Sequence, residues 1–333
     1  MQFLWLLSRM RTPLLDAIFS GITELGAALL LVPIACLLYW IGNRRLSNRI
    51  LFVFFTSALA VQVLKLICRI PRPWVLDPAF APVASALSGA TGYSFPSGHS
   101  QSAMALYGSL ALFFTGLFEH ELRAGRRVSL WYEDGSPARA GEGRGRTAAA
   151  LLCLLLALLV GLSRMYLGVH TPADVLCAFA ITGLIAVAVF VMYPHMIRAD
   201  GAMRMMICSA GGLLSLCAIV FALQTRAAGL AAGDAVAAGM AADCYKAGAA
   251  AAGYFLAEAM IGRRVILERP AASAASKLLQ VVIGLIGLLL LEVGIKKLFG
   301  SNPALDMLRY FSVSLWAVLL WPALQCRGTA DAR

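Results

Sequence analysis

The sequence Gly92-Tyr93-Ser94-Phe95-Pro96-Ser97-Gly98-His99-Ser100 is short and polar, and it leads directly into an apolar run from Ala103 to Phe118. Proline near the start of a helix and glycine beside it allow the backbone to approach a ligand closely. We therefore expect the first-turn N–H groups of Ser97, Gly98 and His99 to be unpaired and to form an anion site. The imidazole of His99 can act there as an acid or a base near neutral pH. The stretch predicts a phosphate site at the mouth of a membrane helix bundle.

The composition of the chain is that of a membrane protein. Of its 333 residues, 60% are hydrophobic and only 14% are charged, and its mean hydropathy is +0.80. Apolar runs of about 20 residues recur, which is the length that a membrane-spanning helix needs. The positive residues behind the formal net charge of +11 cluster in loops between these runs, where topology and anionic lipid explain them. No module that combines basic and aromatic residues is visible, so we expect no binding to nucleic acid.

The apolar runs predict an all-α, polytopic membrane bundle in two parts. Residues 1–194 are expected to form a core of about five spans, preceded by an amphipathic helix over Met1 to Ser20 that lies in the membrane interface. Residues 195–333 are expected to add about four further spans of unknown role. The nine expected spans are Leu25–Ile41, Ile50–Cys68, Pro96–Phe118, Thr147–Ser163, Pro172–Tyr193, Met205–Leu223, Ala235–Ile261, Leu278–Ile295 and Tyr310–Trp321.

A polar, arginine-rich insertion at residues 119–146 interrupts the core. It either contacts anionic lipid or a partner, or it is a disordered topology signal, and neither interpretation requires a catalytic role. With alternating spans, the insertion falls on the same side as Arg44, Arg45 and Arg49, and that side receives most of the Lys and Arg residues. Because positive residues concentrate on the cytoplasmic side, we expect the turn before His99 to face the extracytoplasmic side of the cell membrane.

Three polar clusters fall at this same predicted membrane face. They are Lys65 with Arg72-Pro73, the turn Pro96-Ser97-Gly98-His99, and Ser163-Arg164 with His170 and Asp174. Each residue alone is explained as well by an interfacial anchor or a structural histidine. In order and spacing together, the clusters resemble the three-part signature of the type-2 phosphatidic acid phosphatase superfamily. That superfamily includes lipid phosphate phosphatases, glucose-6-phosphatase-like enzymes and vanadium haloperoxidases.

The resemblance covers Met1 to Tyr193 and implies that the signature residues surround one phosphate. Phosphoryl transfer independently asks for fixed positive charge and for placement of the reacting groups. The expected phosphate-binding groups are Lys65, Arg72, Arg164, Ser97 and the N–H of Gly98. His170 is then the nucleophile, which forms a phosphohistidine, and Asp174 orients its imidazole. His99 is the general acid that protonates the leaving oxygen.

The local sequence suits a pairing of His170 with Asp174. Thr171 can cap the following helix, Pro172 fits its first position, and Asp174 then falls in its first turn. A capping carboxylate without a catalytic role is the alternative interpretation of Asp174.

No metal site and no cofactor are expected from this sequence. No group of carboxylates and histidines beyond the pair already assigned has the spacing of metal ligands, and three fixed cations can take the place of a metal. The eight cysteines show no paired spacing and are expected to be small buried apolar side chains.

The expected substrate is amphiphilic, because the site opens at the membrane surface. Phosphatidic acid, phosphatidylglycerol phosphate, a polyprenyl diphosphate and a sphingoid phosphate all fit, and the sequence chooses neither among these lipids nor an oligomeric state. A lipid phosphotransferase would use the same residues. A transporter or channel with a phosphatase-like half is a different alternative, suggested by ionisable residues of the C-terminal half such as Asp243 and Glu258.

Overall fold

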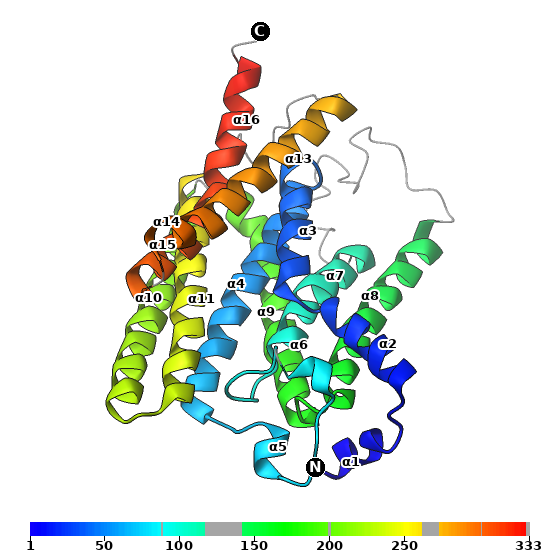
Figure 1. Ribbon diagram of the computed structural model, residues 1–333. Coiled ribbons are helices and arrows are strands. Elements are labelled where there is room, and N and C mark those ends of the chain that lie inside the picture. The colour runs from blue at the N-terminus through cyan, green and yellow to red at the C-terminus, as the bar shows by residue number, and fades with distance from the viewer. Residues whose placement is uncertain (88, 117–141, 199–200, 262–272, 301, 331–333) are drawn as a thin grey trace.

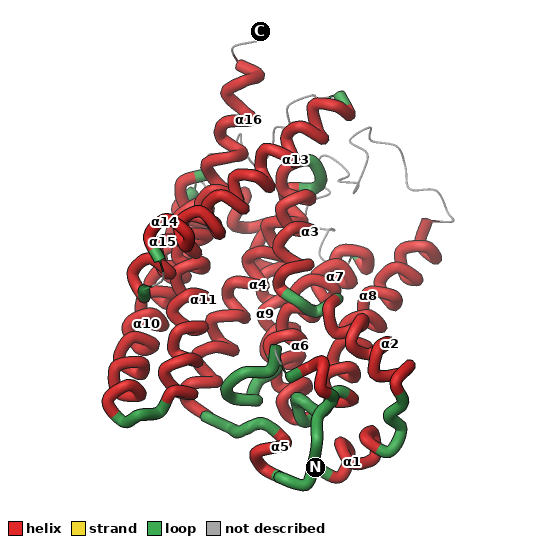
Figure 2. Tube along the Cα trace, viewed as in Figure 1, coloured by secondary structure: helices red, strands yellow, loops and turns green. Residues whose placement is uncertain are grey.

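The computed structural model describes residues 1–87, 89–116, 142–198, 201–261, 273–300 and 302–330. Every regular element in these residues is a helix, so the all-α prediction is confirmed (Figures 1 and 2). The long helices run up and down through one bundle, as alternating spans require (Figure 1). Most of the arginine-rich insertion lies outside the described residues, and only its last part, residues 142–146, is seen at the start of α8.

The N-terminal segment differs from the single interfacial helix that we expected. It forms two helices, α1 (Gln2–Ser8) and α2 (Pro13–Glu24). Thr12 caps α2 by accepting the N–H of Leu15, and Pro13 occupies the first helical position, so a new helix begins where the continuous amphipathic pattern suggested none. α2 then leads into α3 (Ala28–Trp40) through a bend of 41°.

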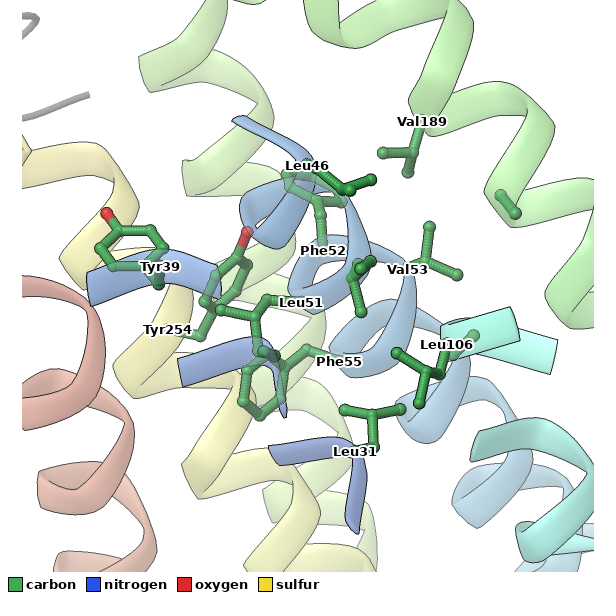
Figure 3. Close-up of a cluster of buried hydrophobic side chains, with 14 of the residues drawn as sticks. Leu31, Tyr39, Leu46, Leu51, Phe52, Val53, Phe55, Leu106, Val189 and Tyr254 are labelled. Carbon is green, nitrogen blue, oxygen red and sulfur yellow. The ribbon is translucent and has the colours of Figure 1, made fainter. Parts of the chain in front are cut away.

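The helix α4 (Arg44–Cys68) lies at the centre of the bundle. It packs against α3, against α9 (Pro172–Arg198), and against α10 and α11 of the C-terminal half. Figure 3 shows side chains of α4 converging with those of neighbouring helices, and the rings of Phe55 and Tyr254 stack with their centroids 4.8 Å apart. The two halves of the chain therefore share one apolar core instead of folding as separate units.

A continuous helical segment that begins directly after Ser97 also packs into this core. It consists of α6 (Gly98–Ala103), a π-helical turn (Met104–Gly108) and α7 (Ser109–Thr115). Gly116, with a φ of 65°, ends it in the left-handed conformation that glycine adopts without strain. α8 (Glu142–Tyr166) lies beside this segment, and α9 continues past the expected domain boundary at residue 194 to Arg198.

The C-terminal half is a pair of hairpins. α10 (Ala202–Ala231) and α11 (Ala235–Met260) pack along their whole length in Figure 1. The second hairpin joins α13 (Ala274–Leu289), a π-helical turn and α14 (Ile295–Phe299) to α15 (Pro303–Leu315), another π-helical turn and α16 (Trp321–Ala330). α13 leaves most of its leucines and isoleucines exposed, as a lipid-facing helix does.

Six helices of the described residues are long and apolar enough to cross a membrane, and α2 with α3 brings the number to seven if the bent pair is one span. The chain is a multi-pass membrane protein with fewer clear spans than the nine that we expected. Two expected spans fall outside this set, namely α11 and the helix that begins at Gly98. Both carry polar residues, and α11 is rich in Ala and Gly instead of Leu and Ile.

We expect the substitution Gly253→Ala to destabilise the packing of α11 on α15. A Cβ at this position would overlap the carbonyl oxygen of Phe311, and overpacking of this kind costs about 1–3 kcal/mol. Gly239→Ala, on the same helix with open space beside it, is the matched control and should be neutral or stabilising. Thermal unfolding of the purified proteins in detergent tests this, and a Gly253→Ala protein as stable as the control would contradict it.

Candidate active site

The three segments that carry the signature meet at one end of the bundle, at the bottom of Figure 1. They are the end of α4 with the loop into α5 (Pro73–Leu76), the start of α6, and the link from α8 to α9. The expected site residues are buried there, namely Lys65, Arg72, Ser97, Arg164, His170 and Asp174. Gly98 and His99 are half-buried at the same end.

The start of α9 places Asp174 beside His170. The Thr171 N–H donates to Asp174 Oδ2 at 2.7 Å, and the Asp174 N–H donates to Thr171 Oγ1 at 3.4 Å. This reciprocal cap turns the carboxylate back toward the chain before the helix. The Asp174 carbonyl in turn accepts the Ser97 N–H at 3.1 Å, so that α9 and α6 begin in contact. Asp174 is thus both a capping residue and a neighbour of His170.

A serine that sequence reasoning missed lies between His170 and Asp174. The distance from His170 Nδ1 to Asp174 Oδ2 is 3.5 Å, which is long for a hydrogen bond. Ser94 Oγ donates to Asp174 Oδ2 at 2.6 Å and lies 3.4 Å from His170 Nδ1. Ser94 is fully buried. Its membership of the Gly92–Ser100 stretch was the one signal available, because a serine in a polar turn is otherwise unremarkable in a sequence.

Arg72 is held in place by backbone oxygens. Its guanidinium donates from Nε to Gly92 O at 3.2 Å, from NH2 to Thr91 O at 2.9 Å and from NH1 to Val169 O at 2.9 Å. The same NH1 lies 3.0 Å from His170 Nε2. Because an arginine nitrogen can only donate, Nε2 is the accepting nitrogen of the ring and Nδ1 carries the proton toward Asp174 and Ser94.

Of the other two cations, Lys65 is held by backbone oxygens and Arg164 by a hydroxyl. Lys65 Nζ donates to Tyr93 O at 3.0 Å and to Ser94 O at 3.5 Å. Arg164 donates from NH1 to Thr23 Oγ1 at 2.8 Å, while its buried Nε has no hydrogen-bond partner among the described residues. A buried donor without a partner costs free energy, so the Nε of Arg164 is available to an incoming acceptor.

The N-terminus of α6 differs in one respect from our expectation. The Ser97 N–H is paired with Asp174, so the prediction of three free N–H groups was wrong for Ser97. Ser97 Oγ instead caps the helix and accepts from Ser100 N–H and Oγ. The space beside Gly98 is open, with no atom within 4 Å of the position of a Cβ. A ligand can therefore approach the backbone there, as a glycine at a helix N-terminus allows.

The electrostatics of the site favour a neutral His170. Burial, followed by the positive charges of Arg72 and its neighbours, holds the pKa of His170 well below its ordinary value of 6.5. A lowered pKa leaves the imidazole neutral throughout the physiological range, with a lone pair on Nε2. Burial, followed by the positive charges of Arg164, Arg72 and Lys65, lowers the pKa of His99 to about 3, so this ring is also neutral until a bound anion offsets those charges.

The buried charge at this end of the bundle is mainly positive, because three buried cations face one buried carboxylate, that of Asp174. The carboxylates of Asp243 and Glu24 act on Lys65 and Arg164 from less buried positions. Together with the open backbone at Gly98, this arrangement can bind an oxyanion and present a nucleophilic nitrogen to it. In the part of the chain that the structure describes, no three His, Cys, Asp or Glu side chains are grouped so as to hold a metal ion.

Comparison with known proteins gives consistent matches. Residues 47–198 match the model of the PAP2 superfamily, and residues 245–331 match that of the PAP2 superfamily phosphatase, transmembrane extension. Phosphatidylglycerophosphatase B of Bacillus subtilis (strain 168) is 32% identical over 180 residues, which cover 51% of this chain and 71% of the relative. Lipid phosphate phosphatase delta of Arabidopsis thaliana is 29% identical over 178 residues, covering 51% of this chain but only 36% of the plant protein.

A solved structure is also similar. The first transmembrane PAP2 type phosphatidylglycerolphosphate phosphatase from Bacillus subtilis has 27% sequence identity and a TM-score of 0.44, and the match covers 59% of this chain and 85% of that one.

We expect Arg72→Lys to weaken the binding of a tetrahedral oxyanion although it keeps the charge. An ammonium group cannot satisfy the Gly92, Thr91 and Val169 carbonyls in the fork geometry of a guanidinium, and charge-assisted hydrogen bonds of this kind contribute about 1.5–3 kcal/mol each. Titration calorimetry should show an affinity for orthovanadate that is at least tenfold lower, which corresponds to the loss of about one such hydrogen bond. Arg69→Lys, at an exposed neighbour, is the control, and equal affinities for the two variants would refute the proposed geometry.

Proposed function

The chain belongs to the PAP2 superfamily, and we propose that it hydrolyses the phosphate monoester or diphosphate of a membrane lipid through a phosphohistidine, without a metal. It is a multi-pass membrane phosphatase of this family, with a core joined to a transmembrane extension.

One observation carries the proposal. The Nε2 atom of His170 is buried and lies 3.0 Å from Arg72 NH1, at the end of the bundle where Lys65 and Arg164 are also buried. A phosphoryl group in transfer carries negative charge spread over its oxygens, so fixed cations stabilise its transition state. Arg72, Lys65 and Arg164 are already held by backbone and hydroxyl acceptors. The groups therefore need little reorganisation when the substrate binds.

In the first step, His170 Nε2 attacks phosphorus and the bond from phosphorus to the lipid oxygen breaks. His99 gives its proton to the leaving oxygen. The positive charge that develops on the His170 imidazole is stabilised by Asp174, both directly and through Ser94 Oγ. In the second step, water attacks the phosphohistidine, His99 takes a proton from it, and phosphate leaves with His170 restored.

The substrate class follows from where the pocket lies. It is at one end of a bundle whose outer helices expose leucine, isoleucine and valine, so a phosphate at the membrane surface with an apolar tail in lipid can reach it. The names of the two curated relatives, a phosphatidylglycerophosphatase and a lipid phosphate phosphatase, support this class. We place the pocket on the extracytoplasmic side, because Arg44, Arg45 and Arg49 lie at the opposite end of α4.

The variants His170→Ala and His99→Ala test the residue roles. We expect His170→Ala to abolish phosphate release from lipid phosphates and His99→Ala to slow it by about 10²–10⁴-fold, the usual contribution of a general acid. His195→Ala, at the other end of α9, is the control and should remain active. Phosphate released by purified protein from vesicles of each candidate lipid is the measurement, with melting curves to show that the variants fold.

Brief reaction with radiolabelled substrate should label wild-type protein on a histidine, in an acid-labile and alkali-stable form, and should leave His170→Ala unlabelled. Label that persists in His170→Ala would refute the assignment of His170 as the nucleophile. Transfer of the label to an added alcohol in place of water would make the enzyme a phosphotransferase.

Activity should persist in a strong chelator, because three fixed cations take the part that a metal plays in other phosphatases. Phosphate release is measured after dialysis against EDTA, with and without added Mg²⁺. Orthovanadate should inhibit, since it mimics five-coordinate phosphorus. Loss of activity in EDTA that Mg²⁺ restores would contradict the metal-free mechanism.

A further inference from the structure

The loop that holds two of the cations is itself held by α11, in the part of this helix that precedes the residues matching the transmembrane extension. Residues 91–94 supply the carbonyl oxygens that fix Arg72, from Thr91 and Gly92, and those that fix Lys65, from Tyr93 and Ser94. A shift of this loop therefore moves both positive groups together. The reaction rate depends strongly on the positions of such groups, because a displacement of about 1 Å can lower it on the order of 10²-fold.

On one side the loop is anchored within the core. The Ser94 N–H donates to Ile70 O at 2.8 Å, and Ser94 Oγ donates to Asp174. On the other side its contacts are with α11, which lies far away in the sequence. The Tyr93 N–H donates to Met240 Sδ at 3.3 Å, within the range for a sulfur acceptor.

Two further observations involve the same methionine. Gly92 has a φ of 65°, and a Cβ at this position would overlap Met240 Sδ, so the loop passes directly over the side chain. Met240 is itself buried in an apolar cluster that joins Leu66 of α4 to α11, and Tyr93 packs against that cluster. A long unbranched side chain fills such an irregular gap well.

A charged residue of α11 also acts on the site. Asp243 lies one turn after Met240 on α11, and its carboxylate interacts electrostatically with Lys65. The face of α11 that carries Met240 and Asp243 is thus turned toward the catalytic end of α4, with which α11 packs.

We propose that Met240 of α11 is a positioning residue of the phosphatase site: it fixes the 91–94 loop, and through the loop carbonyls it fixes Arg72 and Lys65. This helix, which lies outside residues 47–198, therefore forms one wall of the site instead of serving only as additional membrane anchorage. This inference rests on the proposed function, since its readout is lipid phosphate hydrolysis.

The test compares Met240→Ala with Met260→Ala, the same substitution at an exposed position of the same helix. We expect Met240→Ala to lower kcat by about ten- to a hundredfold and to weaken inhibition by orthovanadate by a similar factor, with KM for the lipid changed less than about threefold. Met240→Leu restores the packing and should recover most of the lost kcat. Met260→Ala should behave as wild type.

Gly92→Ala adds a second, independent test. This change should nearly abolish activity, because the new methyl group meets Met240 and the backbone is left-handed there. Truncation of Met240 removes that overlap. The double variant Gly92→Ala/Met240→Ala should therefore be more active than Gly92→Ala alone, which two independent defects could not produce.

The outcomes separate the two proposals. If wild-type protein releases no phosphate from any lipid phosphate, the proposed function fails. If wild type is active but Met240→Ala matches Met260→Ala in kcat, KM and vanadate inhibition, the function stands and the positioning role of Met240 is refuted. Loss of kcat that Met240→Leu does not recover, or that follows the melting temperature of the variants, would also overturn it.

Discussion

Three positive side chains, Lys65, Arg72 and Arg164, are buried at one end of this bundle near one buried carboxylate, that of Asp174. Burial of a charge is costly unless hydrogen bonds or an opposite charge compensate for it. Here the compensation comes mainly from carbonyl oxygens, which pair with the cations without neutralising them. The pocket therefore keeps a surplus of positive charge in a place with little water, where the attraction for an oxyanion is strongest.

Because carbonyl oxygens hold Lys65 and Arg72, the path of the backbone determines where these two positive groups lie. The oxygens on Arg72 come from the 91–94 loop and from Val169 in the link between α8 and α9. The link also folds back on itself, with the Val169 and His170 N–H groups donating to Arg164 O. Each loop is fixed by the helices that it joins, and two of these helices, α6 and α9, pack against α4. The packing of the membrane core and the geometry of the site are thus one arrangement.

Local rules of sequence predicted those features that depend on a few consecutive residues. Thr171, Pro172 and Asp174 form the expected helix start, since a cap needs only its own turn. The same rules applied to Thr12 and Pro13 mark the start of α2, but the amphipathic pattern across Met1 to Ser20 concealed the break. The amphipathic pattern alone therefore predicted one helix, whereas the capping residues indicate two.

Other features depend on contacts between distant segments. The Ser97 N–H is paired with Asp174 O, and Ser94 lies between His170 and Asp174. No spacing rule foresees either contact, because both join residues nearly eighty positions apart that meet only when α6 and α9 pack together. Met240 and the 91–94 loop are in contact although they are separated by even more residues in the sequence.

The sequence by itself determined the all-helical membrane class, the identity of the charged and imidazole side chains, and the helix starts that present them. These depend on hydropathy and on short-range hydrogen bonding, which operate within a few residues. Only the tertiary structure decided which nitrogen of His170 faces Arg72, which carbonyl oxygens hold the cations, and that α11 contacts the 91–94 loop. These depend on how helices far apart in the chain pack around α4, and packing is a property of the whole bundle, not of any one segment.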